Sequence, residues 1–169
     1  MNDTATLSSG LTIGLADYGD QRDAADVVTL LEAYACDPMG GGAALDNSVK
    51  ARLVGDLAAN PHAFSLLARA GDEAVGLANC FMGYSTFAAA PLVNIHDFAV
   101  LPGHRGAGIG KALMAAIETE ALKRGACKIT LEVLSGNHPA QRLYAACGYG
   151  DYQLDPASGH ALFWQKRLT

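Results

Sequence analysis

The chain has 169 residues, a formal net charge of -5, and apolar residues at half of its positions. This length and apolar content allow a core without disulfides or metals, which excludes disordered, collagen-like and disulfide-dense proteins. The four cysteines form no C-x-x-C pair, so we expect free, buried thiols and no metal site. No apolar run approaches the roughly 18 residues of a membrane helix, and the first nine residues lack a signal-peptide pattern. We therefore expect a cytoplasmic domain without a membrane partner.

Charge is distributed unevenly along the chain. Residues 1–100 hold 12 acidic and 4 basic side chains, whereas residues 101–169 hold 5 acidic and 8 basic ones. Two surfaces of opposite sign are one interpretation, and simple solubility is the other. Because nucleic-acid-binding domains are usually basic overall, we expect no nucleic-acid partner.

The first half of the chain predicts helices between strands. We expect a flexible N-terminus over residues 1–9 and a short strand at 11–15, where apolar residues alternate. Asp20 is the predicted cap of a helix that ends at the glycine-rich stretch 37–42, and a second helix follows Asn47 and ends before Pro61. The predicted strands that follow span residues 63–70, 74–81 and 92–100.

The second half alternates helix and strand. A helix with apolar residues at 113, 114, 117 and 122 ends at residues 123–125, and a strand at 128–134 follows. A short helix over 139–147 and a terminal hairpin over 149–168 complete the prediction. The expected fold class is α/β (α+β): one domain over residues 1–169, with a mixed central sheet of about seven strands and about four helices on both faces.

The strongest local signal is a glycine turn between a strand and a helix, spanning residues 95–111. Glycines allow close backbone approach, and free N–H groups at a helix start favour an anion, so we expect a phosphate-bearing ligand. A Walker loop is excluded because Arg105 and Ala112 stand where it requires glycine and Ser or Thr. The G-x-G-x-x-G dinucleotide fingerprint also fails in every frame.

Two sequence blocks resemble the GNAT superfamily of acetyl-CoA-dependent N-acetyltransferases. Arg105 to Gly110 reads R-x-x-G-x-G, which is similar to the family's pyrophosphate loop. Asn137 to Tyr149 resembles its N-x-x-A-x-x-L/F-Y-x-x-x-G-F/Y signature, and the order of elements from residue 10 onward is also similar. The resemblance implies a GNAT fold, acetyl-CoA as co-substrate, no metal, and often a homodimer.

The resemblance assigns cofactor-binding roles to two segments and one side chain. Backbone N–H groups of the turn, with the Arg105 side chain, are expected to bind the pyrophosphate. The edge of the preceding strand is expected to pair with the pantetheine arm, with an N–H near Ala99 aimed at the thioester oxygen. Asn137 is expected to hydrogen-bond the same arm, or to cap its helix, or both. The backbone positions are Phe98, Ala99, Val100, Gly106, Ala107, Gly108, Ile109, Gly110 and Lys111.

The resemblance also assigns catalytic roles. Tyr144 occupies the position of the family's general acid, which protonates the coenzyme thiolate. His96 and Asp97 stand where a base for the amine is often found; strand alternation predicts opposite faces for them, and we favour His96. A covalent route through Cys127 or Cys147 is the chemical rival, but direct transfer is what the resemblance implies.

The predicted function is direct acetyl transfer from acetyl-CoA to a primary amine of a small, cationic acceptor. Acidic residues of the first half, with Tyr34 and Tyr84, are expected near the acceptor cleft and favour a cation. The alternatives are a catalytically idle acyl-CoA-binding module, acting as sensor or structural part, and an enzyme that acetylates protein or peptide amines. The acidic residues meant are Glu32, Asp37 and Asp46.

Overall fold

The computed structural model describes residues 5–7, 10–152, 155, 157 and 159–168. The chain divides into two compact units, residues 1–131 and residues 132–169. The first unit carries the sheet and three of the four α-helices found among the described residues. The second carries helix α4 (His138–Ala146).

Two helices precede the central strands, close to the predicted positions. α1 (Gln21–Cys36) is capped by Asp20, whose carboxylate accepts the N–H groups of Arg22 and Asp23 at 2.9 Å each. α2 (Asn47–Ala59) follows the glycine-rich loop, and it ends before the predicted proline break. None of the helices that the structure describes is long and apolar enough to span a membrane.

Six strands of the described chain form one mixed sheet, and they lie side by side in the order of the sequence. Neighbouring strands are antiparallel from the first to the fifth, and the fifth and sixth are parallel. A parallel pair needs a crossover, which here is helix α3 (Ile109–Lys123). The strands are β1 (Ala5–Leu7), β2 (Leu11–Leu15), β3 (Ala63–Ala70), β4 (Glu73–Ser85), β5 (Ala90–Val100) and β6 (Ile129–Leu131).

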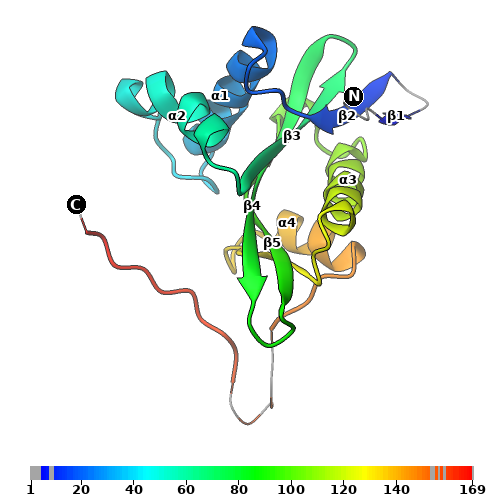
Figure 1. The fold of residues 1–169 in the computed structure, drawn as a ribbon. Helices are drawn as coiled ribbons and strands as arrows, with labels where there is room; N and C mark the ends of the chain where they lie inside the picture. Colours follow the sequence, from blue (N-terminus) through cyan, green and yellow to red (C-terminus); the bar gives the residue numbers. More distant parts are fainter. Residues whose placement is uncertain (1–4, 8–9, 153–154, 156, 158, 169) are drawn as a thin grey trace. The chain divides into compact units, whose positions relative to one another are not determined.

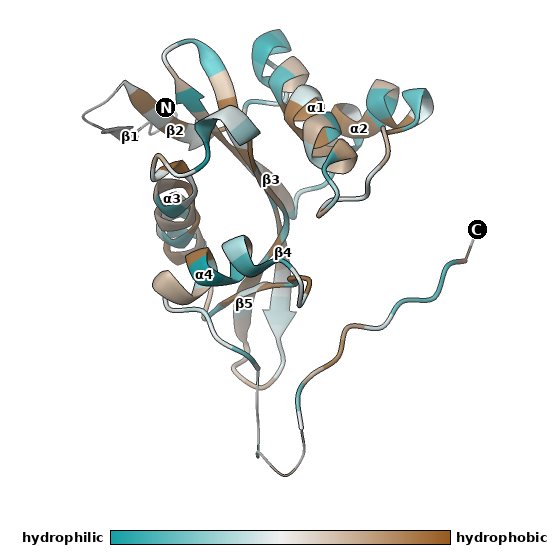
Figure 2. Ribbon diagram, turned by 180° about the vertical axis from the view of Figure 1, so that it is seen from behind, coloured by the Kyte–Doolittle hydropathy of each residue, from teal (hydrophilic) through white to brown (hydrophobic). Residues whose placement is uncertain are grey.

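Helices cover both faces of this sheet (Figure 1). α1 and α2 pack on one face, called here the α1/α2 face, and α3 packs on the other. Figure 2 shows β3 largely in hydrophobic colours between these layers, as expected for a strand buried on both faces. The predicted mixed sheet with helices on both faces is therefore confirmed. The core of the α1/α2 face consists of Val27, Leu30, Leu57, Leu67 and Leu77.

Several strand predictions need correction. Residues 5–7, expected in a flexible N-terminus, form β1 by pairing with β2, while residues 1–4 and 8–9 lie outside the described chain. β4 and β5 are longer than predicted, and β6 ends at Leu131 rather than at residue 134. The described residues of 149–168 contain no strand, so the described sheet has six strands and not about seven. Alternation favours a strand, but an extended segment becomes one only where a partner accepts its hydrogen bonds.

Candidate active site

A β-bulge in β5 occurs at the two residues that the sequence suggests as bases. Asn79 of β4 faces Asp97 of β5, yet the next residue, Cys80, faces Ile95. His96 is therefore the extra residue of a bulge. Because a bulge interrupts the alternation of side chains, the prediction that His96 and Asp97 point to opposite faces is wrong.

The bulge brings His96 and Asp97 together on the α1/α2 face. Asp97 Oδ2 accepts a hydrogen bond from Asn79 Nδ2 at 3.0 Å, and the His96 ring meets Phe81 edge-on, 5.6 Å between centroids. Asn79 and Phe81 are two residues apart on β4 and so share a face, and Phe81 packs against the core of the α1/α2 face. His96 is exposed, whereas Asp97 is half-buried.

Tyr34 of α1 is the aromatic residue near this pair. Burial, and then the negative charges of Asp97 and Asp37, raise the pKa of Tyr34. Its hydroxyl group therefore remains protonated at neutral pH and can donate a hydrogen bond. Tyr84, the other expected aromatic contact, is 61% exposed near the end of β4.

The last part of β5 extends beyond its parallel partner. The β5–β6 pairing ends at Ile95 and Leu131, whereas β5 continues to Val100. Within residues 10–131, no strand pairs with this side of β5 from His96 onward. This side, called here the β5 edge (residues 96–100), suits an extended ligand that adds hydrogen bonds as a strand would.

Peptide groups along the β5 edge alternate in direction. The N–H of Leu101 donates to the carbonyl of Val75 on β4 at 2.9 Å. Since alternate residues of an antiparallel strand direct their peptide groups to opposite sides, Ala99 faces β4, and Phe98 and Val100 face the β5 edge. The N–H expected near Ala99 is thus that of Phe98 or Val100.

The predicted glycine turn leads from a short 3₁₀ helix, η1 (Pro102–His104), into α3. Gly106 and Gly108 have φ angles of +82° and +83°, a region that side chains disfavour, so glycine is required at both positions. No backbone N–H from Gly106 to Lys111 donates a hydrogen bond to another described residue. These N–H groups lie at the positive end of the α3 dipole, where an anion is stabilised, and the predicted binding of a phosphate here stays a prediction.

The Arg105 side chain is held by two acceptors. Its Nε donates to the carbonyl of Val100 at 2.8 Å, and its Nη2 donates to Asp37 Oδ2 at 2.9 Å. The backbone N–H of Met39 and then Arg105 lower the pKa of the Asp37 carboxyl. Arg105 therefore ties the glycine turn to the loop that follows α1.

Two of the acidic residues expected at the acceptor cleft are already engaged. Glu32 accepts the N–H of Leu45 at 2.8 Å and Lys50 Nζ at 3.1 Å, and both contacts lower its pKa. Asp37 is paired with Arg105, as described above. Asp46 is exposed before α2. The expectation that these residues attract a cationic acceptor stays a prediction.

The remaining predicted residues belong to the second unit. Asn137 precedes α4, and its side-chain oxygen accepts the N–H of Ala140 at 3.3 Å, as the capping interpretation predicts. Tyr144 is buried, and its ring centroid lies 6.3 Å from that of Tyr149. The roles of Asn137 and Tyr144 toward a cofactor stay predictions.

Only one described cysteine is buried. Burial raises the pKa of the Cys80 thiol to about 12, which makes it unreactive. Cys36 and Cys127 are exposed, so the expectation of buried thiols is wrong for both, and Cys147 is half-buried. Among the residues that the structure describes, no three potential metal ligands are grouped together.

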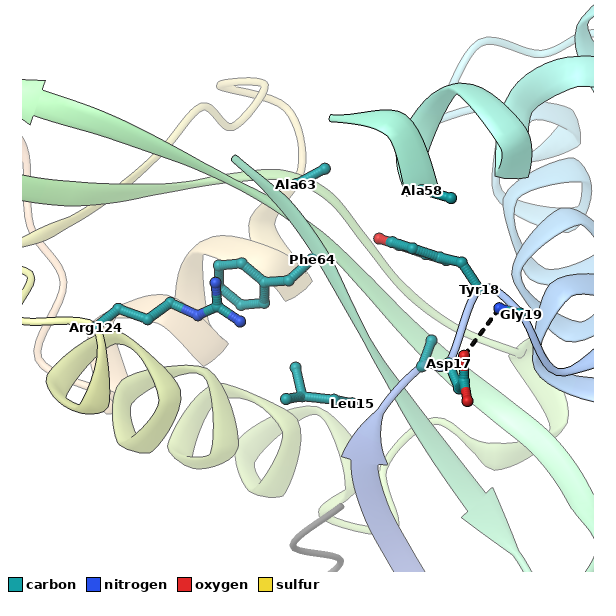
Figure 3. Close-up of a pocket in the computed structure, with 9 residues that line it drawn as sticks. Leu15, Asp17, Tyr18, Gly19, Ala58, Ala63, Phe64 and Arg124 are labelled. Atoms are coloured by element: carbon teal, nitrogen blue, oxygen red, sulfur yellow. Dashed lines mark hydrogen bonds between the residues drawn. The ribbon is translucent and has the colours of Figure 1, made fainter. Parts of the chain in front are cut away.

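A pocket that the sequence analysis does not anticipate opens beside β3, with a volume of about 530 Å³ (Figure 3). The Arg124 guanidinium lies 4.1 Å from the centroid of the Phe64 ring, and its Nε donates to Glu120 at 2.8 Å. Because Arg124 is already paired, the pocket is not an evident anion site. The lining residues are Leu15, Ala16, Asp17, Tyr18, Gly19, Ala58, Ala63, Phe64 and Arg124.

Sequence reasoning missed three polar residues near Asp97. Hydrogen bonds link Tyr18, in the pocket wall, to Ser65 of β3, and Ser65 to Asn79 of β4. The available signal was a single polar residue inside each of two otherwise apolar strand segments, since buried polar groups require partners.

The family of the chain follows from residues 28–149, which match the model of the acetyltransferase (GNAT) family. The matched region includes the bulge, the glycine turn and α4. The chain belongs to this family, as its two sequence motifs indicate, and its fold is the GNAT fold.

The curated relatives match this chain over only part of its length. Streptothricin acetyltransferase of Streptomyces lavendulae is 43% identical over 65 residues, which are 38% of this chain and 34% of the relative. Thialysine N-epsilon-acetyltransferase of Bos taurus is 33% identical over 81 residues, 48% of this chain and 47% of the relative. The chain thus spans about a third to a half of the length of these relatives.

Solved structures share the fold across nearly the whole chain. An aminoglycoside acetyltransferase, meta-AAC0020, from an uncultured soil metagenomic sample has a TM-score of 0.73 at 18% identity, covering 95% of this chain and 100% of that one. A transcriptional regulator from Bacillus halodurans C-125 has a TM-score of 0.73 at 20% identity, covering 92% and 99%. At these identities the likeness concerns the fold alone.

Proposed function

We propose that the chain is an acetyl-CoA-dependent N-acetyltransferase that transfers an acetyl group directly to a primary amine of a small, cationic acceptor. One observation carries this proposal: a single unit holds the glycine turn at the start of α3, the β5 edge, and the His96–Asp97 pair at the bulge of the same strand. Membership of the GNAT family supplies the class of reaction.

The residues of the first unit fit acetyl-CoA, which supplies the acetyl thioester. The N–H groups of Gly106 to Lys111 lack acceptors within the described chain and suit a pyrophosphate. The β5 edge suits the pantetheine arm, and the N–H of Val100 suits the thioester oxygen, while the carbonyl of Val100 already accepts from Arg105 Nε. Arg105, 53% exposed, adds a positive charge beside the turn.

Proton transfer requires a base for the amine and an acid for the departing thiolate. We assign the base to His96 or Asp97, which share one face at the bulge. An imidazole can accept a proton near neutral pH, which favours His96 for this step. Tyr144 is assigned as the acid from the family motif, and Asn137 as a hydrogen-bond partner of the pantetheine arm.

A positively charged acceptor is favoured by Asp97. This carboxylate accepts a hydrogen bond from a neutral amide, and no described cationic side chain forms an ion pair with it. The names of the curated relatives are consistent with amine acceptors, since they concern streptothricin and the ε-nitrogen of thialysine.

Acetyl-CoA binding is tested by calorimetry with EDTA present. We expect binding in the micromolar range that chelation does not change, because the helix N–H groups and Arg105 supply the countercharge. Gly108→Val should abolish binding. Gly125→Val is the matched control, because Gly125 has a similar φ of +70° at the other end of α3. Loss of binding on chelation, or equal binding by both variants, would contradict the cofactor assignment.

Transfer is tested by release of free coenzyme thiol with a panel of amines. Tyr144→Phe should lower kcat by about 10²-fold with little change in acetyl-CoA affinity, whereas Tyr152→Phe, at a residue 59% exposed, should not. Wild-type kcat in Tyr144→Phe would exclude its assigned role. Binding without thiol release from any amine would favour the idle acyl-CoA-binding module, and a preference for peptide amines would favour a protein acetyltransferase.

A further inference from the structure

We propose that Tyr18, Ser65 and Asn79 are positioning residues that hold the Asp97 carboxylate oriented toward the acceptor amine. This inference rests on the proposed function and adds residues outside the two family motifs. It assigns to Asp97 the binding of the acceptor's charged nitrogen.

The four side chains form one continuous hydrogen-bonded chain. The Tyr18 hydroxyl lies 2.7 Å from Ser65 Oγ, Ser65 Oγ donates to Asn79 Oδ1 at 2.6 Å, and Asn79 Nδ2 donates to Asp97 Oδ2 at 3.0 Å. The sheet register produces this arrangement, because Ser65 of β3 faces Asn79 of β4, which faces Asp97 of β5.

The direction of every hydrogen bond in the chain follows from the carboxylate. An ionised Asp97 only accepts, so the Asn79 amide must present its nitrogen to Asp97 and its oxygen to Ser65. The Ser65 proton is then used on Asn79, and Ser65 must accept the proton of Tyr18. Burial is the main cause that raises the pKa of Tyr18, which keeps its hydroxyl protonated as this role requires.

The burial of these hydrogen-bonded side chains argues against a purely structural role. Ser65 and Asn79 are 1% and 3% exposed, and the neighbouring positions on the same face are the core residues Leu67 and Leu77. Apolar side chains at both polar positions would pack without hydrogen bonds to satisfy. The polar chain is explained if its end point, Asp97, needs a fixed and charged carboxylate.

Among the described residues, no cationic side chain forms an ion pair with that carboxylate. The titratable groups near Asp97 are Tyr34 from α1, Cys80 from β4 and His96 on its own strand. The charge of Asp97 raises the pKa of both Tyr34 and the Cys80 thiol. Asp97 Oδ1 accepts no hydrogen bond from any described residue, so it is the oxygen that an ammonium group can approach.

Three variants interrupt this series of hydrogen bonds at successive side chains. Ser65→Ala removes the hydroxyl that holds Asn79 Oδ1, and Tyr18→Phe removes the hydroxyl that holds Ser65, so in both variants the Asn79 amide is positioned less firmly against Asp97. Asn79→Asp places a second carboxylate beside the first. The expected loss in kcat/KM for the amine is about tenfold for Ser65→Ala, smaller for Tyr18→Phe and larger for Asn79→Asp. The loss should appear in KM for the amine more than in kcat, because Asp97 is assigned to bind the charged nitrogen of the acceptor.

Matched controls separate this effect from general destabilisation. Ser85→Ala also removes a buried hydroxyl from β4, and Asn60→Asp makes the same amide change at an exposed site. Neither should change KM for the amine. Acetyl-CoA affinity by calorimetry should stay within about twofold of wild type in the three test variants, since the hydrogen bonds that they interrupt do not involve the glycine turn.

A second measurement does not depend on catalysis. The side-chain amide protons of Asn79, followed by NMR at neutral pH, should exchange with solvent faster in Ser65→Ala and Tyr18→Phe than in wild type, because the amide is then held less firmly between Ser65 and Asp97. Equal exchange rates would overturn the proposal, even if the wild type acetylated no amine and the proposed function failed. An active wild type whose KM for the amine is unchanged in Tyr18→Phe and Ser65→Ala would overturn it as well. If Ser65→Ala does not fold, Tyr18→Phe at the half-buried end carries both measurements.

Discussion

The ion pair between Asp37 and Arg105 joins two loops that lie 68 residues apart in sequence. Replacing Asp37 with Asn keeps an oxygen for the Met39 N–H but presents an NH₂ group to the guanidinium, which is also a donor. The charge-assisted hydrogen bond at 2.9 Å is therefore lost.

The cost of Asp37→Asn can be derived from the exposure of the pair. A hydrogen bond to a charged group contributes about 1.5–3 kcal/mol when it is shielded from water. Asp37 is 17% exposed but Arg105 is 53% exposed, so solvent screens the pair and we expect a loss of about 1 kcal/mol in the free energy of unfolding. Asp56→Asn is the control: its partner Arg52 lies 3.5 Å away, both side chains are more than half exposed, and the loss should be below about 0.5 kcal/mol.

The pH dependence of this loss has a definite sign. Folding lowers the pKa of Asp37, so the stabilisation is complete above the ordinary aspartate pKa of about 3.9 and disappears as the pH falls through the lower folded-state pKa. The difference between wild type and Asp37→Asn should be constant from about pH 5 to 7 and shrink below about pH 4. Urea unfolding followed by circular dichroism at several pH values measures it. A difference that grows on acidification, or equal effects of Asp37→Asn and Asp56→Asn at pH 7, would refute the reasoning.

Two further predictions concern packing. Leu77→Ala, at a fully buried position of the α1/α2 face, should lower the free energy of unfolding by about 2–5 kcal/mol in the same urea assay. Leu122→Ala, at a residue 75% exposed, is the control and should change this free energy by less than about 0.5 kcal/mol. Gly40→Ala would place a Cβ 1.9 Å from the carbonyl oxygen of Tyr34, so it should lower Tm. Gly55 lies in α2, and a Cβ added there would have nothing within 4 Å, so Gly55→Ala should raise the free energy of unfolding by up to about 1 kcal/mol. If scanning calorimetry shows Tm shifts of the same sign for Gly40→Ala and Gly55→Ala, this second prediction is wrong.

Local interactions account for the features that the sequence predicts well. Asp20 and Asn137 cap their helices through bonds to residues two or three positions away. Gly106 and Gly108 adopt the positive φ angles that their turn requires. Such features depend on a few consecutive residues, so a single sequence contains the information needed to predict them.

Tertiary structure decides which residues meet across the sheet. The bulge at His96 is a property of the pairing between β4 and β5, and periodicity within β5 alone predicts the wrong face. The exposure of Leu122 likewise departs from its apolar pattern in α3. The contact of Asn79 with Asp97 also depends on strand register. Register and packing result from the summed interactions of distant segments, which no local pattern along one chain specifies.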